Sequence, residues 1–213
     1  MIYGALPEDL GMIDLSPTEM LFWMYCPIKA PKHADWRLPD NLMQFEDIVS
    51  AVYLTHEPFE EWCNSYVYLT AKTLWVSGDY IGNRPGWHSD GFGTDDINYI
   101  WCDRAPTEFV QGEFNLSTDC DESMREMEAI GWLHEATDTL VTFPDKHLLR
   151  LDQSVIHRSP ASFEPGMRTF VKVSISKDRY DLVGNSINHD LPASHWPLIE
   201  RQVTRNHPQS RLA

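Results

Sequence analysis

The pattern of hydrophobic and polar positions changes character at Tyr66. Beyond it, short segments rich in β-branched and aromatic residues are separated by turn residues, which is typical of strands. The two longest segments are 66–76 and 167–176. Shorter strands are predicted at 78–82, 97–102, 108–114, 138–143, 147–151 and 153–158. Many short strands at close spacing predict an antiparallel sandwich or barrel.

The chain before Tyr66 has a helical pattern instead. Ser16-Pro17-Thr18-Glu19 combines a capping serine, a first-turn proline and a glutamate three positions after the cap, which predicts a helix through Cys26. Apolar residues spaced three and four apart predict a second helix over 42–54, followed by a short turn at 59–62. The acidic stretch 119–136 is predicted to be a helical insertion among the strands.

Helices that come first and strands that come later predict a mainly β fold with N-terminal helices. We expect a double-stranded β-helix, a jelly roll of the cupin-like kind, backed by those helices. The chain is expected to form a single domain over 1–213. Within it, 1–65 is predicted to be mostly helical support, 66–176 the β core and 177–213 a C-terminal extension.

The strand at 167–176 predicts two different faces, because successive side chains of a strand point to opposite sides. One face is β-branched and is expected to pack under the helices: Thr169, Val171, Val173 and Ile175. The other face is expected to line the barrel: Arg168, Phe170, Lys172 and Ser174.

Charge narrows the range of partners. The 213 residues include 32 acidic and 17 basic side chains, a formal net charge of −15. Nucleic acid is a disfavoured partner for such a surface, and a neutral or cationic small-molecule substrate is favoured. The four cysteines show no C-x-x-C spacing, so reduced thiols are expected. Without a leader pattern or a membrane-length apolar run, we expect a cytoplasmic protein with no membrane contact. The sequence does not indicate an oligomeric state.

One short motif suggests metal chemistry. His88-Ser89-Asp90 follows a predicted strand and a Pro-Gly turn, and the spacing of two puts both side chains on one side of an extended backbone. A second triplet, His33-Ala34-Asp35, lies among prolines in the first third of the chain and is interpreted as a chance occurrence. With a distal histidine, His157, the first triplet supplies two imidazoles and one carboxylate, the facial set that binds Fe(II) with open positions.

A cation follows the distal histidine. Arg168 comes eleven residues after His157, at the start of the next predicted strand. If these two strands are antiparallel neighbours, Arg168 lies beside the metal and can pair with the carboxylate of a bound acid.

The set His88-Ser89-Asp90, His157 and Arg168 resembles the iron(II)- and 2-oxoglutarate-dependent dioxygenases. The interval of eleven residues and Ser159, two positions after His157, are most similar to the phytanoyl-CoA-hydroxylase-like branch. The resemblance covers about residues 75–176. Plant-type members have Arg-x-Ser on the last strand, whereas this chain has Arg168-Thr169-Phe170, which argues against that branch only.

The resemblance implies a set of roles. His88, Asp90 and His157 are expected to bind Fe(II). Arg168 and Ser159 are expected to bind 2-oxoglutarate, and Tyr80 occupies a position where other members place a phenol on this cosubstrate. Lys172 joins the cosubstrate set because the strand pattern turns it toward the same face. Four residues are candidates for substrate contacts: Trp87, Asn98, Trp101 and Asp95.

The implied reaction consumes O2 and 2-oxoglutarate, releases succinate and CO2, and hydroxylates or desaturates a small-to-medium organic substrate. Asp90 argues against halogenation, since halogenases of this kind replace the carboxylate with a small residue. Two alternatives stay open: a cupin-like metalloenzyme that does not use 2-oxoglutarate, and a non-enzymatic β-sandwich binding module in which the three ligands never converge. Each candidate also has a structural interpretation; Arg168, for example, could simply be a salt-bridge partner on its strand.

Overall fold

The structure is a computed structural model that describes residues 1–78 and 80–201. The described part is mainly β. Its strands are β1 (Glu8–Met12), β2 (Leu21–Lys29), β3 (Tyr66–Val76), β4 (Ile97–Cys102), β5 (Glu108–Phe109), β6 (Val141–Thr142), β7 (His147–Leu151), β8 (His157–Arg158) and β9 (Gly166–Ser176). Its helices are α1 (Glu46–Thr55), α2 (Phe59–Asn64) and α3 (Cys120–Ala136), with 3-10 turns η1 (Asp40–Phe45) and η2 (Pro192–Ser194). Within this part, none of the helices is long and apolar enough to cross a membrane.

Six strands form a large antiparallel sheet in the order β1-β7-β4-β9-β3-β2. Its centre is the pair β3 and β9, which stay in register from Tyr66 opposite Ser176 to Val76 opposite Gly166. The strands predicted at 66–76, 97–102 and 147–151 are confirmed, and the last predicted strand is extended by one residue, to Gly166. The local patterns after Tyr66 therefore predicted β3, β4, β7 and β9 well.

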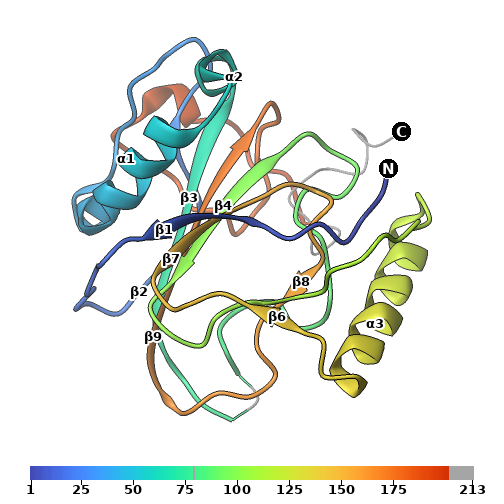
Figure 1. The fold of residues 1–213 in the computed structure, drawn as a ribbon. Coiled ribbons are helices and arrows are strands. Elements are labelled where there is room, and N and C mark those ends of the chain that lie inside the picture. Colours follow the sequence, from blue (N-terminus) through green and yellow to red (C-terminus); the bar gives the residue numbers. More distant parts are fainter. Residues whose placement is uncertain (79, 202–213) are drawn as a thin grey trace.

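The helices α1 and α2 cover one face of the large sheet (Figure 1). Val171, Val173 and Ile175 of β9 lie in the core beneath them, together with Ile48 and Val49 of α1. All five side chains are essentially inaccessible to solvent. Burying each such side chain contributes about 1.5–3 kcal/mol, so this layer anchors β9 in place. The predicted position of the aliphatic residues of β9 under the helices is confirmed.

Three short strands form a second antiparallel sheet in the order β6-β5-β8. His88 lengthens it by a single bridge to His157. The helix α3 lies on the far side of the molecule from α1 and packs against this region through Met127, which contacts the cluster around Trp87 and Ile156 (Figure 1). The predicted helical insertion is confirmed, and the Asp119 carboxylate caps it by accepting hydrogen bonds from the amides of Asp121 and Glu122.

The helix predicted from Ser16 to Cys26 is wrong. Residues Leu21–Lys29 form strand β2, which pairs with β3 along the edge of the large sheet. Its aromatic and β-branched residues suit a half-buried strand, and its Cys26 and Ile28 are fully buried in the core. Hydrogen bonding to the free edge of β3 stabilises the strand more than the local capping pattern would stabilise a helix. With β1 as well, residues 1–65 are a mixture of strand and helix rather than mostly helical support.

The weaker strand predictions were too long. The segments 108–114, 138–143 and 153–158 each contain only two strand residues, those of β5, β6 and β8. At 78–82 the described residues form a single bridge, between Ser77 and Tyr80. A strand extends only as far as its neighbour can pair with it, and the partners in the small sheet are themselves two residues long.

Candidate metal centre

The two histidines of the site face each other across a backbone bridge. The amide of His88 donates to the carbonyl of His157 at 3.0 Å, and the amide of His157 donates back to the carbonyl of His88 at 2.9 Å. Directly opposed residues in an antiparallel pair place their side chains on the same side. The imidazole centroids are consequently 4.6 Å apart.

Asp90 completes the group two positions after His88. Its Oδ2 lies 3.7 Å from Nε2 of His157. One potential ligand atom from each of the three side chains falls within 4.8 Å of the other two. Across residues 1–78 and 80–201, no other group of three His, Cys, Asp or Glu side chains meets this criterion. The second triplet, His33-Ala34-Asp35, does not form such a group.

Hydrogen bonds select the tautomer of each imidazole. Nδ1 of His88 lies 2.8 Å from the carbonyl oxygen of Gly86, and Nδ1 of His157 lies 3.2 Å from that of Val155. A carbonyl can only accept, so each Nδ1 carries the proton and donates. Each Nε2 therefore keeps a free lone pair, the arrangement common among metal-binding histidines.

The electrostatics favour the charge states that a cation requires. Burial and the neighbouring His157 lower the pKa of His88 to about 3, so its ring is neutral near pH 7. Burial alone would raise the pKa of Asp90, but the neighbouring Lys172 ammonium outweighs it and holds the value well below its ordinary range. A neutral imidazole and an ionised carboxylate bind a divalent metal without first losing protons. The donor set therefore fits a divalent ion such as Fe(II).

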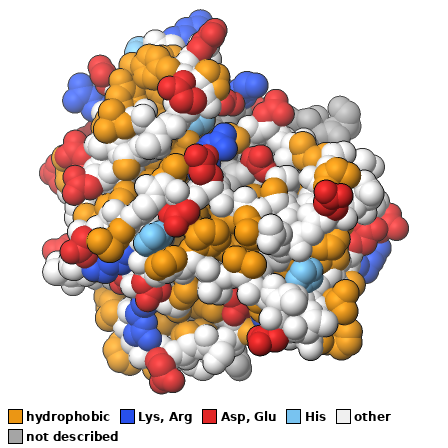
Figure 2. Space-filling model, viewed as in Figure 1, with side chains coloured by type: hydrophobic (Ala, Val, Ile, Leu, Met, Phe, Trp, Pro, Cys, Tyr) orange, Lys and Arg blue, Asp and Glu red, His pale blue; other side chains and the backbone are white. Residues whose placement is uncertain are grey.

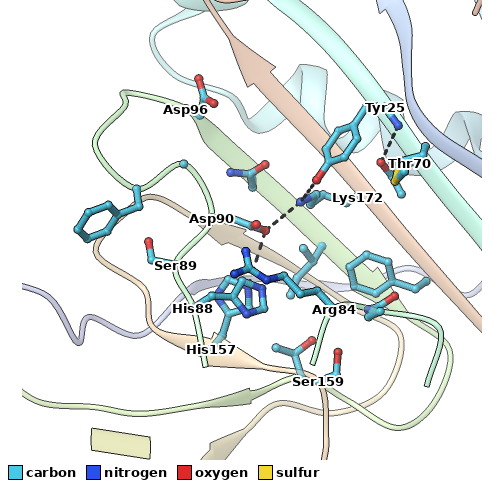
Figure 3. A pocket seen from close by; sticks show the side chains of 18 of the residues that line it. Tyr25, Thr70, Arg84, His88, Ser89, Asp90, Asp96, His157, Ser159 and Lys172 are labelled. Atoms are coloured by element: carbon cyan, nitrogen blue, oxygen red, sulfur yellow. Dashed lines mark hydrogen bonds and ion pairs between the residues drawn. The ribbon is translucent and has the colours of Figure 1, made fainter. Parts of the chain in front are cut away.

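Lys172 forms an ion pair with one of the three candidate ligands, Asp90. Its Nζ lies 3.0 Å from Oδ2 of Asp90 and 3.1 Å from Oη of Tyr25 (Figure 3). Burial would lower the pKa of Lys172, but Asp90 and Tyr25 outweigh it and raise the value. The ammonium is thus charged, and it neutralises the carboxylate ligand from the side of the large sheet.

The three ligands border a cavity of about 370 Å³. Small-molecule pockets have volumes of roughly 300–1,000 Å³, so the space suits a small ligand or two. Residues of both sheets, of the loops and of α3 line it: Met24, Tyr25, Thr70, Lys72, Asn83, Arg84, His88, Ser89, Asp90, Gly91, Phe92, Asp96, Asn98, Ile100, Thr107, Met124, Met127, His157, Ser159, Phe170, Lys172, Tyr180 and Arg201.

Only two of the four residues predicted to bind the cosubstrate lie at the cavity. Ser159 and Lys172 line the cavity, whereas Arg168 and Tyr80 do not. The guanidinium of Arg168 is buried and donates to the carbonyl oxygens of Arg104 at 3.0 Å and Ala105 at 3.1 Å. Tyr80 is 62% exposed on the surface.

The observed pairing of β8 and β9 explains the position of Arg168. The strands carrying His157 and Arg168 were predicted to be antiparallel partners, and that prediction is wrong. β8 pairs with β5 in the small sheet, and β9 pairs with β3 and β4 in the large one. His157 and Arg168 therefore lie in different sheets, and Lys172 rather than Arg168 reaches Asp90.

The predicted substrate residues also separate. Asn98 lines the cavity, where its Oδ1 accepts a hydrogen bond from Ser174 at 2.6 Å. Trp101 belongs to the core under α1, with its Nε1 donating to the carbonyl of Ile13 at 3.0 Å. Successive residues of β4 point to opposite faces of the sheet, so Trp101 points away from the cavity that Asn98 lines. The remaining two, Trp87 and Asp95, also do not line the cavity.

Trp87 and Asp95 have structural surroundings of their own. Trp87 is buried against α3, and the Arg158 guanidinium lies 4.7 Å from its ring centroid. The Asp95 side chain is 80% exposed and lies 3.5 Å from Nζ of Lys177. The neighbouring Asp96 faces the cavity instead and accepts a hydrogen bond from Tyr180 at 2.7 Å.

Several cavity residues were missed from the sequence. Lys72 and Thr70 share a face of β3, so the alternation of that strand could have identified them once its orientation was known. Arg84 lies in the loop directly before His88, and its proximity in the sequence was an available signal. Tyr25 sits at an irregularity of β2 with φ of 48°, and no pattern in the sequence indicates that position.

Comparison with known proteins adds no family assignment. No protein-family model matches the chain, and a search of curated proteins gives no match. The site is therefore interpreted from its own residues.

Proposed function

We propose that the protein is an Fe(II)- and 2-oxoglutarate-dependent oxygenase that hydroxylates or desaturates a small organic substrate. The observation that carries the proposal is the convergence of His88, Asp90 and His157 on one wall of a cavity. Two imidazoles and one carboxylate on one face leave the opposite coordination positions open, as this chemistry requires. When bound there, iron would supply the activation of O2 that drives oxidation of the substrate.

The order of the strands supports the proposed double-stranded β-helix. Eight segments are counted along the chain, in the order β3, His88, β4, β5, β6, β7, β8 and β9. In the large sheet the neighbours run β3-β9-β4-β7, which are segments 1, 8, 3 and 6. In the small sheet they run His88-β8-β5-β6, which are segments 2, 7, 4 and 5. Alternation between two sheets in this way is the connectivity of a jelly roll.

The protein's own groups suit an α-keto diacid. Lys72 lines the cavity, and burial and the charges of Lys172 and Arg168 lower its pKa to about 8. Lys72 and Lys172 both line the cavity, and two like charges in one cavity are stabilised by an anion bound beside them. We assign the contact with the distal carboxylate to Lys72, because it lines the cavity and Arg168 does not. Nζ of Lys72 donates to the carbonyl of Gly82 at 3.1 Å, which leaves two of its three donors for a ligand. The Ser159 hydroxyl also lines the cavity and can donate to the same ligand.

Lys172 has a different task in this proposal. Its ammonium orients Asp90 through the 3.0 Å contact and holds the carboxylate ionised. Tyr25 fixes the ammonium from the other side at 3.1 Å. Together they hold the Asp90 carboxylate in place in the metal-free protein.

A second candidate uses the same ligands without 2-oxoglutarate. The absence of Arg168 from the cavity lining favours a cupin-like metalloenzyme that acts on a bound substrate directly. Formation of succinate from 2-oxoglutarate separates the two candidates. The third alternative was a binding module in which His88, Asp90 and His157 stay apart. The three side chains converge, so this observation does not support it.

The decisive experiment is an anaerobic titration of the Fe(II)-loaded protein with 2-oxoglutarate. We expect a weak visible charge-transfer band, which arises when the keto acid chelates iron. The protein with His157→Ala is the control and should give no band. Full iron loading of the wild-type protein with neither a band nor succinate release in air would contradict the proposal.

A further inference from the structure

The charge of the cavity is opposite to the charge of the protein. Over the described residues its lining contains four basic side chains, Lys72, Arg84, Lys172 and Arg201, and only two carboxylates, Asp90 and Asp96. The whole chain has 17 basic and 32 acidic side chains. Figure 2 shows acidic side chains spread over the visible surface among fewer basic ones. Basic residues are thus concentrated where a ligand would bind.

Both carboxylates of the cavity already have partners. Asp96 accepts a hydrogen bond from Tyr180, and Asp90 pairs with Lys172 and belongs to the metal ligands. Fe(II) and dianionic 2-oxoglutarate would add equal and opposite charges. The excess of basic over acidic side chains would therefore remain after both had bound, and a cavity wall of that charge attracts anions.

Arg84 is the cation best placed for a third ligand. It belongs to the loop before His88, and its side chain reaches across the cavity toward His88 and Asp90 (Figure 3). The residue is exposed, so a ligand that enters from solvent can reach it. Its guanidinium donates to Sδ of Met124 at 3.0 Å, which is a weak acceptor. Among the described residues, no carboxylate lies within ion-pair distance of Arg84.

We propose that the substrate oxidised in this cavity is a small organic acid and that Arg84 binds its carboxylate. The inference rests on the proposed function and names the class of substrate. The planar guanidinium can bind a carboxylate through two parallel hydrogen bonds, which holds the rest of the molecule in a defined orientation beside the metal ligands. The acidic net charge of the chain predicted a neutral or cationic substrate, but the local charge of the lining decides which ligand is attracted.

The test uses the Fe(II)-loaded protein, saturated with 2-oxoglutarate and kept anaerobic. It is titrated with a panel of small monocarboxylic acids, their primary amides and the corresponding primary amines. We expect some acids to shift the charge-transfer band and the matched amides and amines to have no effect. Arg84→Gln should weaken binding of those acids about tenfold or more, and Arg84→Lys should restore part of it. The affinity for 2-oxoglutarate should be unchanged in both variants.

A matched control removes an equal charge elsewhere. Arg125 is exposed on α3 and does not line the cavity, so Arg125→Gln should leave binding of the acids unchanged. The proposal is overturned if no acid binds to the wild-type protein, if amides bind as well as acids, or if Arg84→Gln weakens 2-oxoglutarate and the acids equally. Acids that abolish the band without shifting it displace the cosubstrate and also count against it.

Failure of the proposed function would be recognised separately. If 2-oxoglutarate does not bind, the same panel is titrated against the metal-loaded protein alone, with a shift in thermal stability as the measurement. Acid binding that depends on Arg84 would then support the anion site although the oxygenase proposal has failed.

Discussion

Nζ of Lys172 lies 3.0 Å from Oδ2 of Asp90, although the two residues are 82 positions apart in the sequence. In the metal-free protein the ammonium is the cation that balances the carboxylate ligand. A divalent metal would compete with it for the same oxygen. The pair therefore couples metal binding to the stability of the fold.

Replacing Lys172 tests this coupling. Lys172→Met leaves Asp90 without its buried partner, and the free energy of unfolding of the metal-free protein should fall by about 3 kcal/mol. Metal should then stabilise the variant more than the wild type, because it meets an unpaired carboxylate. Thermal unfolding with chelator and with Mn(II) measures both effects. An equal or smaller rise in melting temperature in the variant would show that the ammonium and the metal do not compete.

The two His-x-Asp triplets should behave differently. Asp90→Ala or His88→Ala should abolish binding of a stoichiometric divalent metal while the protein stays folded, because each removes one of three ligands. His33→Ala and Asp35→Ala provide matched controls in an exposed triplet and should leave the metal content unchanged. Metal analysis after dialysis measures the stoichiometry. Loss of metal in the control variants would place the site elsewhere.

Lys72 and Arg168 can be separated by a pair of ligands. 2-Oxopentanoate has the chain length of 2-oxoglutarate but lacks the distal carboxylate, so the ratio of the two affinities measures recognition of that group. Lys72→Met should reduce this ratio by a factor that corresponds to about 2–4 kcal/mol of binding free energy, because Lys72 lines the cavity. Arg168→Gln should preserve the ratio and lower stability, because its guanidinium holds the backbone at Arg104 and Ala105. The reverse result would assign the carboxylate to Arg168.

Gly131 of α3 packs directly against Trp87, which precedes His88 of the candidate metal site. A Cβ at this position of α3 would lie 2.0 Å from Nε1 of Trp87, the residue before the first ligand. Gly131→Ala gains about 1 kcal/mol of helix propensity but forces Trp87 to move, which costs about 1–3 kcal/mol. We expect lower stability and weaker metal binding, measured by urea unfolding and metal titration. Adding Trp87→Phe, which makes room, should recover part of the stability; a stable Gly131→Ala variant with full metal affinity would contradict this packing.

Stability should depend on pH through two histidines. Burial, together with nearby Arg150, lowers the pKa of His56 from 6.5 to about 4, and burial and His157 lower that of His88 to about 3. The unfolded chain binds these protons more readily, so their contribution to stability is fully present above about pH 6.5 and is lost as the pH falls toward 4. Each histidine adds a slope of at most about 1.4 kcal/mol per pH unit.

Urea unfolding of the metal-free protein between pH 5 and 7.5 measures that slope. The His56→Gln variant should show a shallower slope, and His33→Gln, at an exposed position, should not change it. A stability that is constant over this range in the wild-type protein would show that neither histidine resists protonation in the folded state.

Much of the β core and the ligand set was predictable from the sequence because the signals were local. Alternation predicted β3, β4, β7 and β9, and it predicted that Val171, Val173 and Ile175 share a buried face. The types of residue in His88, Asp90 and His157 were enough to suggest a metal. The strand β2 was not predictable, because Ser16-Pro17-Thr18-Glu19 resembles a helix start and only the free edge of β3 made a strand preferable.

The sequence by itself determined which faces of the strands are apolar and which donor atoms are available. Only the tertiary structure decided which of these side chains meet. It brought Lys172 rather than Arg168 to Asp90, placed Lys72 and Arg84 in the cavity wall, and turned Trp101 into the core. The physical reason is that a local pattern specifies a face, whereas a contact between sheets depends on which strands pair, and β8 and β9 pair with different partners.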